Sequence, residues 1–318
     1  MNFWPLILIV ITVAAVRIIG IVLRRYAIGS TIIRIIGKLV WLFPIGIFGD
    51  VIGSTHLSLF SLFAVLIFLK LPVSTMFQSL YQIVGMVFPR ITHKFNLPSK
   101  ENYMAKSSYI LPFTGKWTVV NGGVTKELSH SWSIISQRYA YDFIIVDDEG
   151  KSFSRDSRSV HSYYCYGKDI VAPADGEVVK LSNNYKDSFV DGKNAYCDAM
   201  NIAGNYIIIK HNDDEYSAVA HIMKGSIAVK VGDKVKQGQI IAKCGNSGNS
   251  SEPHIHFQLQ SSKSFFLSAG LPIAFSALKA DSKTNYELLD KRPCDNNLLV
   301  IGDKTYIGRG LEVENGNG

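Results

Sequence analysis

Long apolar runs dominate the first ninety residues of the chain. Phe3–Leu23 is apolar apart from Arg17, and Val51–Leu69 carries no formal charge. Each run is long enough to cross the hydrocarbon core of a bilayer as a helix, which takes about 20 residues. A third run, Leu71–Pro89, is interspersed with polar residues and fits either an interfacial helix or a further span. We therefore predict an α-helical membrane region over residues 1–90, with two transmembrane helices or three.

The pattern changes beyond a polar linker at residues 91–104. Short runs rich in β-forming residues follow one another, separated by turns, and such spacing is typical of a sandwich or barrel. We expect strands at Trp117–Val120, Ala140–Val146, Gly176–Leu181, Tyr206–Lys210, Tyr216–His221, Gln239–Ala242 and His254–Gln260. The sequence thus predicts an all-β domain over residues 105–318, an antiparallel sheet or hybrid barrel-sandwich with a groove. Its C-terminal extension, from Ser264, is expected to add strands or a lid.

The run from His254 to Gln260 alternates strictly between polar and apolar residues. In a strand, residues two apart lie on one face, so Ile255, Phe257 and Leu259 should point into a core. His254, His256, Gln258 and Gln260 should then line a polar surface. Two imidazoles about 7 Å apart on one strand face can hold a metal and a catalytic group side by side.

Basic residues are concentrated in the predicted membrane region. Residues 1–100 contain nine Lys and Arg against one acid, Asp50, whereas the chain as a whole has a net charge of +7. The excess belongs to the apolar region, so it does not indicate nucleic-acid binding. Four of the basic residues follow the first span and place that loop in the cytoplasm by the positive-inside tendency. Two spans would then put the β domain outside the cell.

Asp142 lies within the apolar run that begins at Ala140. A buried acid is rare unless it is paired or binds a metal, so Asp142 is either one half of a salt bridge or a metal ligand. Taken in order, several segments resemble the lysostaphin-type zinc metallopeptidases, which cut peptide bonds in bacterial peptidoglycan. The resemblance covers about residues 115–260 and is carried by Ala140–Phe143, Asp169–Val179, Ala220–Ile222, Val231–Gly238, Gly245–Gly248 and His254–Phe257.

This resemblance implies one zinc per chain and a role for each site residue. Asp142 and His256 are similar to the family's carboxylate and imidazole ligands, and His221 and His254 to its two catalytic histidines. The family usually has a histidine four residues before the aspartate, where this chain has Arg138. We predict His130 as the remaining ligand, with His161 as the rival.

Together with the apolar runs over residues 1–90, the resemblance to enzymes that act on bacterial peptidoglycan predicts a bacterial membrane protein with an extracytoplasmic catalytic domain. The expected partners are peptidoglycan peptides and, through residues 1–90, a lipid bilayer, with no nucleic acid. Three ligands with an open fourth position are the usual catalytic zinc arrangement. We therefore predict a multi-pass, membrane-anchored zinc metalloendopeptidase. The alternatives are a catalytically inactive wall-binding or regulatory domain of the same fold, and a peptidase acting on a protein substrate.

All four cysteines lie in the predicted outer domain. An even number of cysteines outside the cell permits two disulfides. Cys165 with Cys197 is the first candidate pair, and buried free thiols are the alternative for the set Cys165, Cys197, Cys244 and Cys294.

Overall fold

The computed structural model describes residues 84–190, 201–294 and 298–316, together with residues 45, 52 and 53. Apart from residues 52 and 53, the predicted transmembrane helices Phe3–Leu23 and Val51–Leu69 lie outside these described residues. Within the described residues, no helix has both the length and the apolar content that crossing a membrane requires. Of the third apolar run, residues 84–89 are described, and residues 84–92 are helical. The membrane region therefore finds no support in the described part and stays a prediction.

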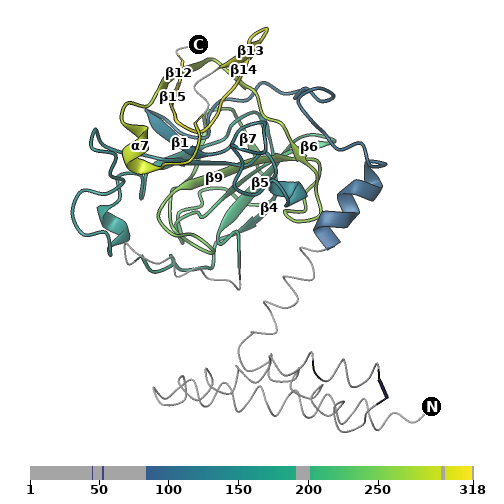
Figure 1. The fold of residues 1–318 in the computed structure, drawn as a ribbon, viewed down its shortest axis with the longest axis horizontal. Coiled ribbons are helices and arrows are strands. Elements are labelled where there is room, and N and C mark those ends of the chain that lie inside the picture. Colours follow the sequence, from purple (N-terminus) through teal and green to yellow (C-terminus); the bar gives the residue numbers. More distant parts are fainter. Residues whose placement is uncertain (1–44, 46–51, 54–83, 191–200, 295–297, 317–318) are drawn as a thin grey trace. The chain divides into compact units, whose positions relative to one another are not determined.

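A ten-stranded antiparallel sheet forms the centre of the β domain, with β9 in its middle (Figure 1). The strands follow the order β12-β15-β1-β2-β9-β6-β5-β4-β7, and β10 also pairs with β9. Their bounds in that order are Leu278–Ser282, Leu311–Asn315, Trp117–Asn121, Tyr141–Ile144, Ile255–Gln260, Glu215–Ala220, Tyr206–Asn212, Gly176–Ser182 and Lys234–Val235, with β10 at Gly270–Leu271. The antiparallel all-β prediction is confirmed for this part of the chain.

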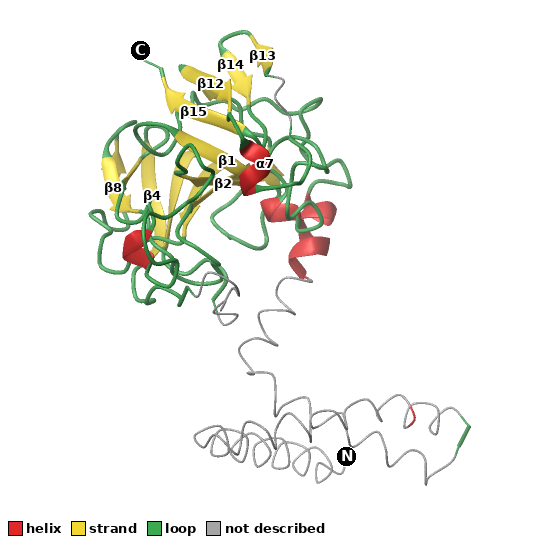
Figure 2. Ribbon diagram, turned by 60° about the vertical axis from the view of Figure 1, so that its left-hand side comes forward, coloured by secondary structure: helices red, strands yellow, loops and turns green. Residues whose placement is uncertain are grey.

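Two smaller sheets and short helical turns complete the domain (Figure 2). One small sheet pairs β3 with β8, and the other has the order β11-β14-β13. The bounds are Asp169–Val171 for β3, Ile240–Lys243 for β8, Phe275–Ser276 for β11, Lys304–Tyr306 for β14 and Leu299–Ile301 for β13. The helical turns are η3 at Ile135–Gln137, η4 at Val160–Ser162 and α7 at Tyr286–Leu289. In both ribbon views α7 lies beside β1.

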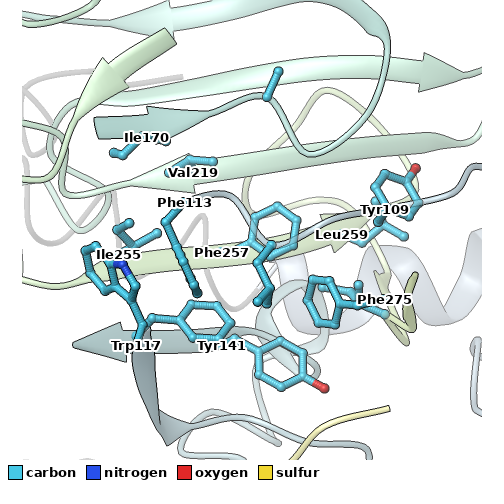
Figure 3. Packing of buried hydrophobic residues seen from close by; sticks show 14 of the residues in the cluster. Tyr109, Phe113, Trp117, Tyr141, Ile170, Val219, Ile255, Phe257, Leu259 and Phe275 are labelled. Atoms are coloured by element: carbon cyan, nitrogen blue, oxygen red, sulfur yellow. The ribbon is translucent and has the colours of Figure 1, made fainter. Parts of the chain in front are cut away.

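One face of the central sheet carries the main hydrophobic core. Ile255, Phe257 and Leu259 of β9 are all at most 1% exposed, as the alternating pattern predicted. Figure 3 shows Phe257 among the other aromatic side chains, and its ring centre lies 6.1 Å from that of Phe275. Aromatic pairs at this distance contribute stability beyond their buried area. The core therefore fixes which way β9 turns its other face.

The opposite face of β9 is also covered, which the sequence pattern did not indicate. Gln258 and Gln260 are 1% and 0% exposed, so the expectation that they line a surface is wrong. A second apolar cluster of Ala203, Ile208, Ala218, Ala220 and Phe265 lies on this side of the sheet. The ring of Phe265 lies 6.0 Å from that of His256. The segment that follows β9 thus folds back over its polar face.

The C-terminal extension adds strands to the central sheet. β15 pairs with β1, and β12 pairs with β15, so the end of the chain extends the sheet beyond its first strand. The sequence left open whether this extension adds strands or a lid, and where such strands would pair, because pairing between distant segments leaves no local pattern. The same extension supplies α7.

Three cysteines of the described residues are free thiols, with Cys165 and Cys244 buried and Cys294 exposed. The predicted Cys165–Cys197 disulfide is therefore wrong for Cys165, whose Sγ instead donates to the carbonyl oxygen of Pro253 at 3.0 Å. Cys197 lies outside the described residues. Burial of two thiols without a bridge agrees with the alternative that the sequence left open.

Candidate metal centre and active site

Strand register brings Asp142 and His256 together. Asp142 of β2 pairs directly with His256 of β9, and Ala220 of β6 pairs with His256 on its other side. Directly paired side chains on one face lie within contact distance, and His256 Nδ1 is 2.9 Å from Asp142 Oδ1. Asn121 of β1 donates from Nδ2 to Asp142 Oδ2 at 2.9 Å. Both carboxylate oxygens are therefore held in place.

His130 reaches this pair from a loop ahead of β2. Its Nδ1 lies 3.5 Å from Asp142 Oδ2. Ser131 Oγ donates to the carbonyl oxygen of Gln137 at 3.0 Å, which closes the loop on itself. Arg138, at the position where the resemblance has a histidine, turns to Trp132: its guanidinium lies 4.9 Å from the ring centre and Nε donates to the Trp132 carbonyl. These contacts of Arg138 thus stabilise the loop that carries His130.

His130, Asp142 and His256 form a group that is suited to a metal ion. One candidate donor atom from each lies within 4.8 Å of the others. A tetrahedral zinc with bonds of about 2.0–2.1 Å spaces its ligands about 3.3 Å apart, so small side-chain adjustments suffice. Two imidazoles and one carboxylate are also a donor set that zinc accepts. The residues present therefore fit the ion that the resemblance implies.

Protonation in this group follows from burial and from the neighbouring charges. Burial raises the pKa of Asp142, but His130, His254 and His256 outweigh it and hold that pKa well below the ordinary value. Burial lowers the pKa of His130 against the opposing effect of Asp142. Burial also lowers the pKa of His256, but its contact with Asp142 prevails and raises it. A metal would thus meet an ionised carboxylate and would displace the proton of His256.

His221 and His254 stand side by side next to the three candidate ligands, with ring centres 4.6 Å apart. Each directs Nδ1 to a backbone carbonyl at 2.8 Å, His221 to Ser247 and His254 to Glu252. A carbonyl only accepts, so Nδ1 carries the proton in both neutral rings and Nε2 is left as an acceptor. His254 Nε2 lies 3.6 Å from Asp142 Oδ1. The loop before β9 therefore orients two proton acceptors beside the same carboxylate.

His221 also has an unusual backbone and an unusual protonation state. Its φ of 61° is left-handed, a conformation that costs a residue with a Cβ about 1–2 kcal/mol. Such strain is typically kept at functional sites. Burial, reinforced by His254 and His256, lowers the pKa of His221 well below its ordinary value. His221 is therefore neutral at neutral pH and can accept a proton.

His161, the rival ligand, lies elsewhere. It is exposed, in η4, and its ring contacts Tyr166 at a centre distance of 5.0 Å. The structure therefore places His130, and not His161, beside Asp142. Sequence spacing could not separate the two histidines, because each lies in an irregular segment.

Two cavities that share Asp142 and His254 flank the site. A cavity of about 390 Å³ is bordered by the four site histidines, Asp142 and Phe265, among others. A second cavity of about 260 Å³ shares Asp142 and His254 and extends to Leu289, Asp290 and Arg292. These last three residues belong to the C-terminal extension, and no pattern in the sequence indicated that they lie near the site.

Fold and site together define an all-β domain with a His-Asp-His candidate metal centre. Residues 157–266 match the model of Peptidase family M23, a family of zinc metallopeptidases. His221, His254 and His256 lie within that match, whereas His130 and Asp142 precede it. The resemblance noted in the sequence is thereby confirmed.

Known proteins resemble parts of the chain. It is 34% identical over 132 residues to "Murein hydrolase activator NlpD" of Salmonella dublin, covering 42% of this chain and 30% of that protein. It is 38% identical over 98 residues to "Peptidoglycan DD-endopeptidase ShyB" of Vibrio cholerae, covering 30% and 22%. The catalytic domain of the M23 protein EnpA from Enterococcus faecalis superposes with a TM-score of 0.34 at 19% identity, over 52% of this chain and 94% of that domain. The chain thus matches less than a third of the length of either sequence relative.

Proposed function

We propose that the protein is a membrane-anchored zinc metalloendopeptidase that hydrolyses peptide bonds in peptidoglycan. The observation that carries the proposal is the convergence of His130, Asp142 and His256 with two further histidines whose Nε2 atoms are free to accept a proton. The family of the domain and the printed name of the relative ShyB point to a peptidoglycan substrate. Anchoring through residues 1–90, with the catalytic domain outside the cytoplasm, places the site where this substrate is.

The residues divide the chemical work between them. His130, Asp142 and His256 would hold the ion, which when bound supplies Lewis acidity toward a water and the scissile carbonyl. His221 or His254 accepts the proton of the attacking water at Nε2 and returns it to the leaving amine as the C–N bond breaks. The other histidine, once it holds a proton on Nε2, donates a hydrogen bond to the carbonyl oxygen as charge develops there. Cavities on both sides of Asp142 accommodate the chain on either side of that bond.

The test is release of new amino groups from purified peptidoglycan by the full-length chain. Release that stops with a chelator and returns with one equivalent of zinc is expected. A His254→Ala variant that still contains zinc but releases nothing serves as the matched control, because His254 lies outside the candidate ligand group. Mass analysis of the fragments would identify the bond. No release from a folded, zinc-loaded chain would refute the proposal.

A second candidate function is a catalytically inactive wall-binding or regulatory domain. Arg138 at the family's usual histidine position and the printed name of the activator NlpD favour it. Under this alternative the chain would bind peptidoglycan with less than one zinc per chain. A folded chain that sediments with peptidoglycan, lacks zinc and releases no amino groups would establish it.

A further inference from the structure

A row of buried amides extends from His256 away from the candidate metal centre. His256 Nε2 lies 3.0 Å from Gln258 Oε1, Gln258 Nε2 donates to Gln260 Oε1 at 2.6 Å, and Gln260 Nε2 donates to the carbonyl oxygen of Ser262 at 2.7 Å. His256, Gln258 and Gln260 are 4%, 1% and 0% exposed. Because the row is closed to water, its members have to satisfy one another.

The far end of the row fixes the direction of every hydrogen bond in it. The Ser262 carbonyl can only accept, so Gln260 must turn its Nε2 toward it and its Oε1 toward Gln258. Gln258 must then donate with Nε2 and turn its Oε1 toward His256. An amide oxygen can only accept, so His256 Nε2 carries a proton. Nδ1 lies 2.9 Å from the Asp142 carboxylate, which also only accepts, so the proton that a metal would displace is the one on Nδ1.

We propose that Gln258 is a positioning residue that, held by Gln260 and Ser262, makes Nδ1 the metal-binding atom of His256. The inference rests on the proposed zinc function and deepens it. A ligand histidine commonly donates its second N–H to a carbonyl or carboxylate, which fixes both the tautomer and the ring plane. In this chain the partner comes from the ligand's own strand, two residues on, where alternation places it on the same face.

The proposed role of Gln258 explains why the buried face of β9 carries two glutamines and not apolar residues. Burying an amide is favourable only when its hydrogen bonds are made, and an apolar pair at 258 and 260 would not have that requirement. The amides keep His256 from rotating its ring or exchanging its tautomer. The hydrogen bonds along the row offset the cost of burying these amides and also hold the ligand geometry.

The test is the zinc affinity of the full-length chain, measured by competition with a chromophoric chelator. Gln258→Met removes the acceptor and keeps an unbranched side chain, and zinc binding should weaken about 10–100-fold. Gln258→Glu keeps an oxygen toward Nε2–H and should bind zinc more tightly than Gln258→Met. As a matched control, Ser217→Ala removes a partly buried 2.8 Å hydrogen bond to His211. That histidine is not in the metal group, and zinc affinity should be unchanged.

Nitrogen NMR of the imidazoles gives a readout that a merely structural role would not move. The zinc-loaded wild type should show His256 with a protonated Nε2 and a metal-bound Nδ1, assigned by its loss in His256→Ala. Wild-type affinity in Gln258→Met, equal weakness of both Gln258 variants, or zinc on Nε2 would each overturn the inference alone. A wild-type chain that binds no zinc would overturn the proposed function as well.

Discussion

His221 offers a sharp test of the division between ligands and catalytic residues. It lies outside the group of candidate donors, yet its ring centre is 5.8 Å from that of His256. His221→Ala should therefore keep one zinc per chain and lose activity. Loss of a group that transfers a proton costs about 10²–10⁴-fold in rate, which at about 1.4 kcal/mol per tenfold is about 3–5 kcal/mol of transition-state stabilisation.

The left-handed backbone at His221 suggests a second variant, His221→Gly, whose stability should differ from that of His221→Ala. Both His221→Ala and His221→Gly lose the hydrogen bond to Ser247 O, worth about 0.5–1.5 kcal/mol. Alanine keeps the left-handed strain of about 1–2 kcal/mol at φ 61°. Glycine relieves the strain and gives back about 0.5–1 kcal/mol through the entropy of the unfolded chain. The glycine variant should therefore be more stable than the alanine variant by about 0.5–1 kcal/mol.

Three measurements on the same preparations decide the case. Amino-group release from peptidoglycan gives kcat/KM, metal analysis gives zinc per chain, and urea unfolding gives the stability difference. Both variants should be equally inactive, with full zinc. Zinc loss in parallel with activity would make His221 a ligand and refute the assignment. An alanine variant at least as stable as the glycine variant would refute the strain argument.

Two further predictions concern the ligands and the domain's response to acid. His130→Ala, Asp142→Ala and His256→Ala should each lose zinc and activity together in metal analysis and peptidoglycan assays, whereas the exposed His161→Ala should keep both; normal zinc in His130→Ala would contradict the ligand set. Glu215 is fully buried and accepts hydrogen bonds from Tyr103 Oη at 2.5 Å, Tyr109 Oη at 2.9 Å and the backbone of Lys106 and Ser107. Burial raises the pKa of Glu215, but these bonds prevail and lower it below its ordinary value. Its stabilisation is thus present above the unfolded pKa and lost as pH falls through the folded one. Glu215→Gln should lower the unfolding temperature most near pH 7 and least in acid; a difference that is independent of pH would contradict this account.

Much of the candidate site could be predicted from the sequence because it lies on or beside regular strands. The alternation in Ile255–Gln260 placed His256 opposite the core, and the apolar run around Asp142 marked a buried acid that needs partners. The seven expected strands all occur, with bounds within a few residues of those in the structure. These features depend on local periodicity, which a single sequence displays.

What the sequence left open depends on contacts between distant segments. His130 and His161 lie in irregular loops, and only the packing of Arg138 on Trp132 and the register of β2 with β9 bring one of them to Asp142. Asp290 and Arg292 border the second cavity beside the site, where the Arg292 guanidinium donates to the carbonyl oxygen of Val120 in β1 at 3.3 Å.

The sequence by itself determined that β9 has one apolar and one polar face. It also indicated that Asp142, His130 and His256 are of the residue types that bind a metal ion. It did not determine that the polar face is buried, because alternation reports which side chains share a face and not what covers that face. The tertiary structure decided this by folding the segment after β9 back over Gln258 and Gln260. The row of amides that orients His256 exists only because that covering excludes water, which would otherwise satisfy the same hydrogen bonds without fixing their direction.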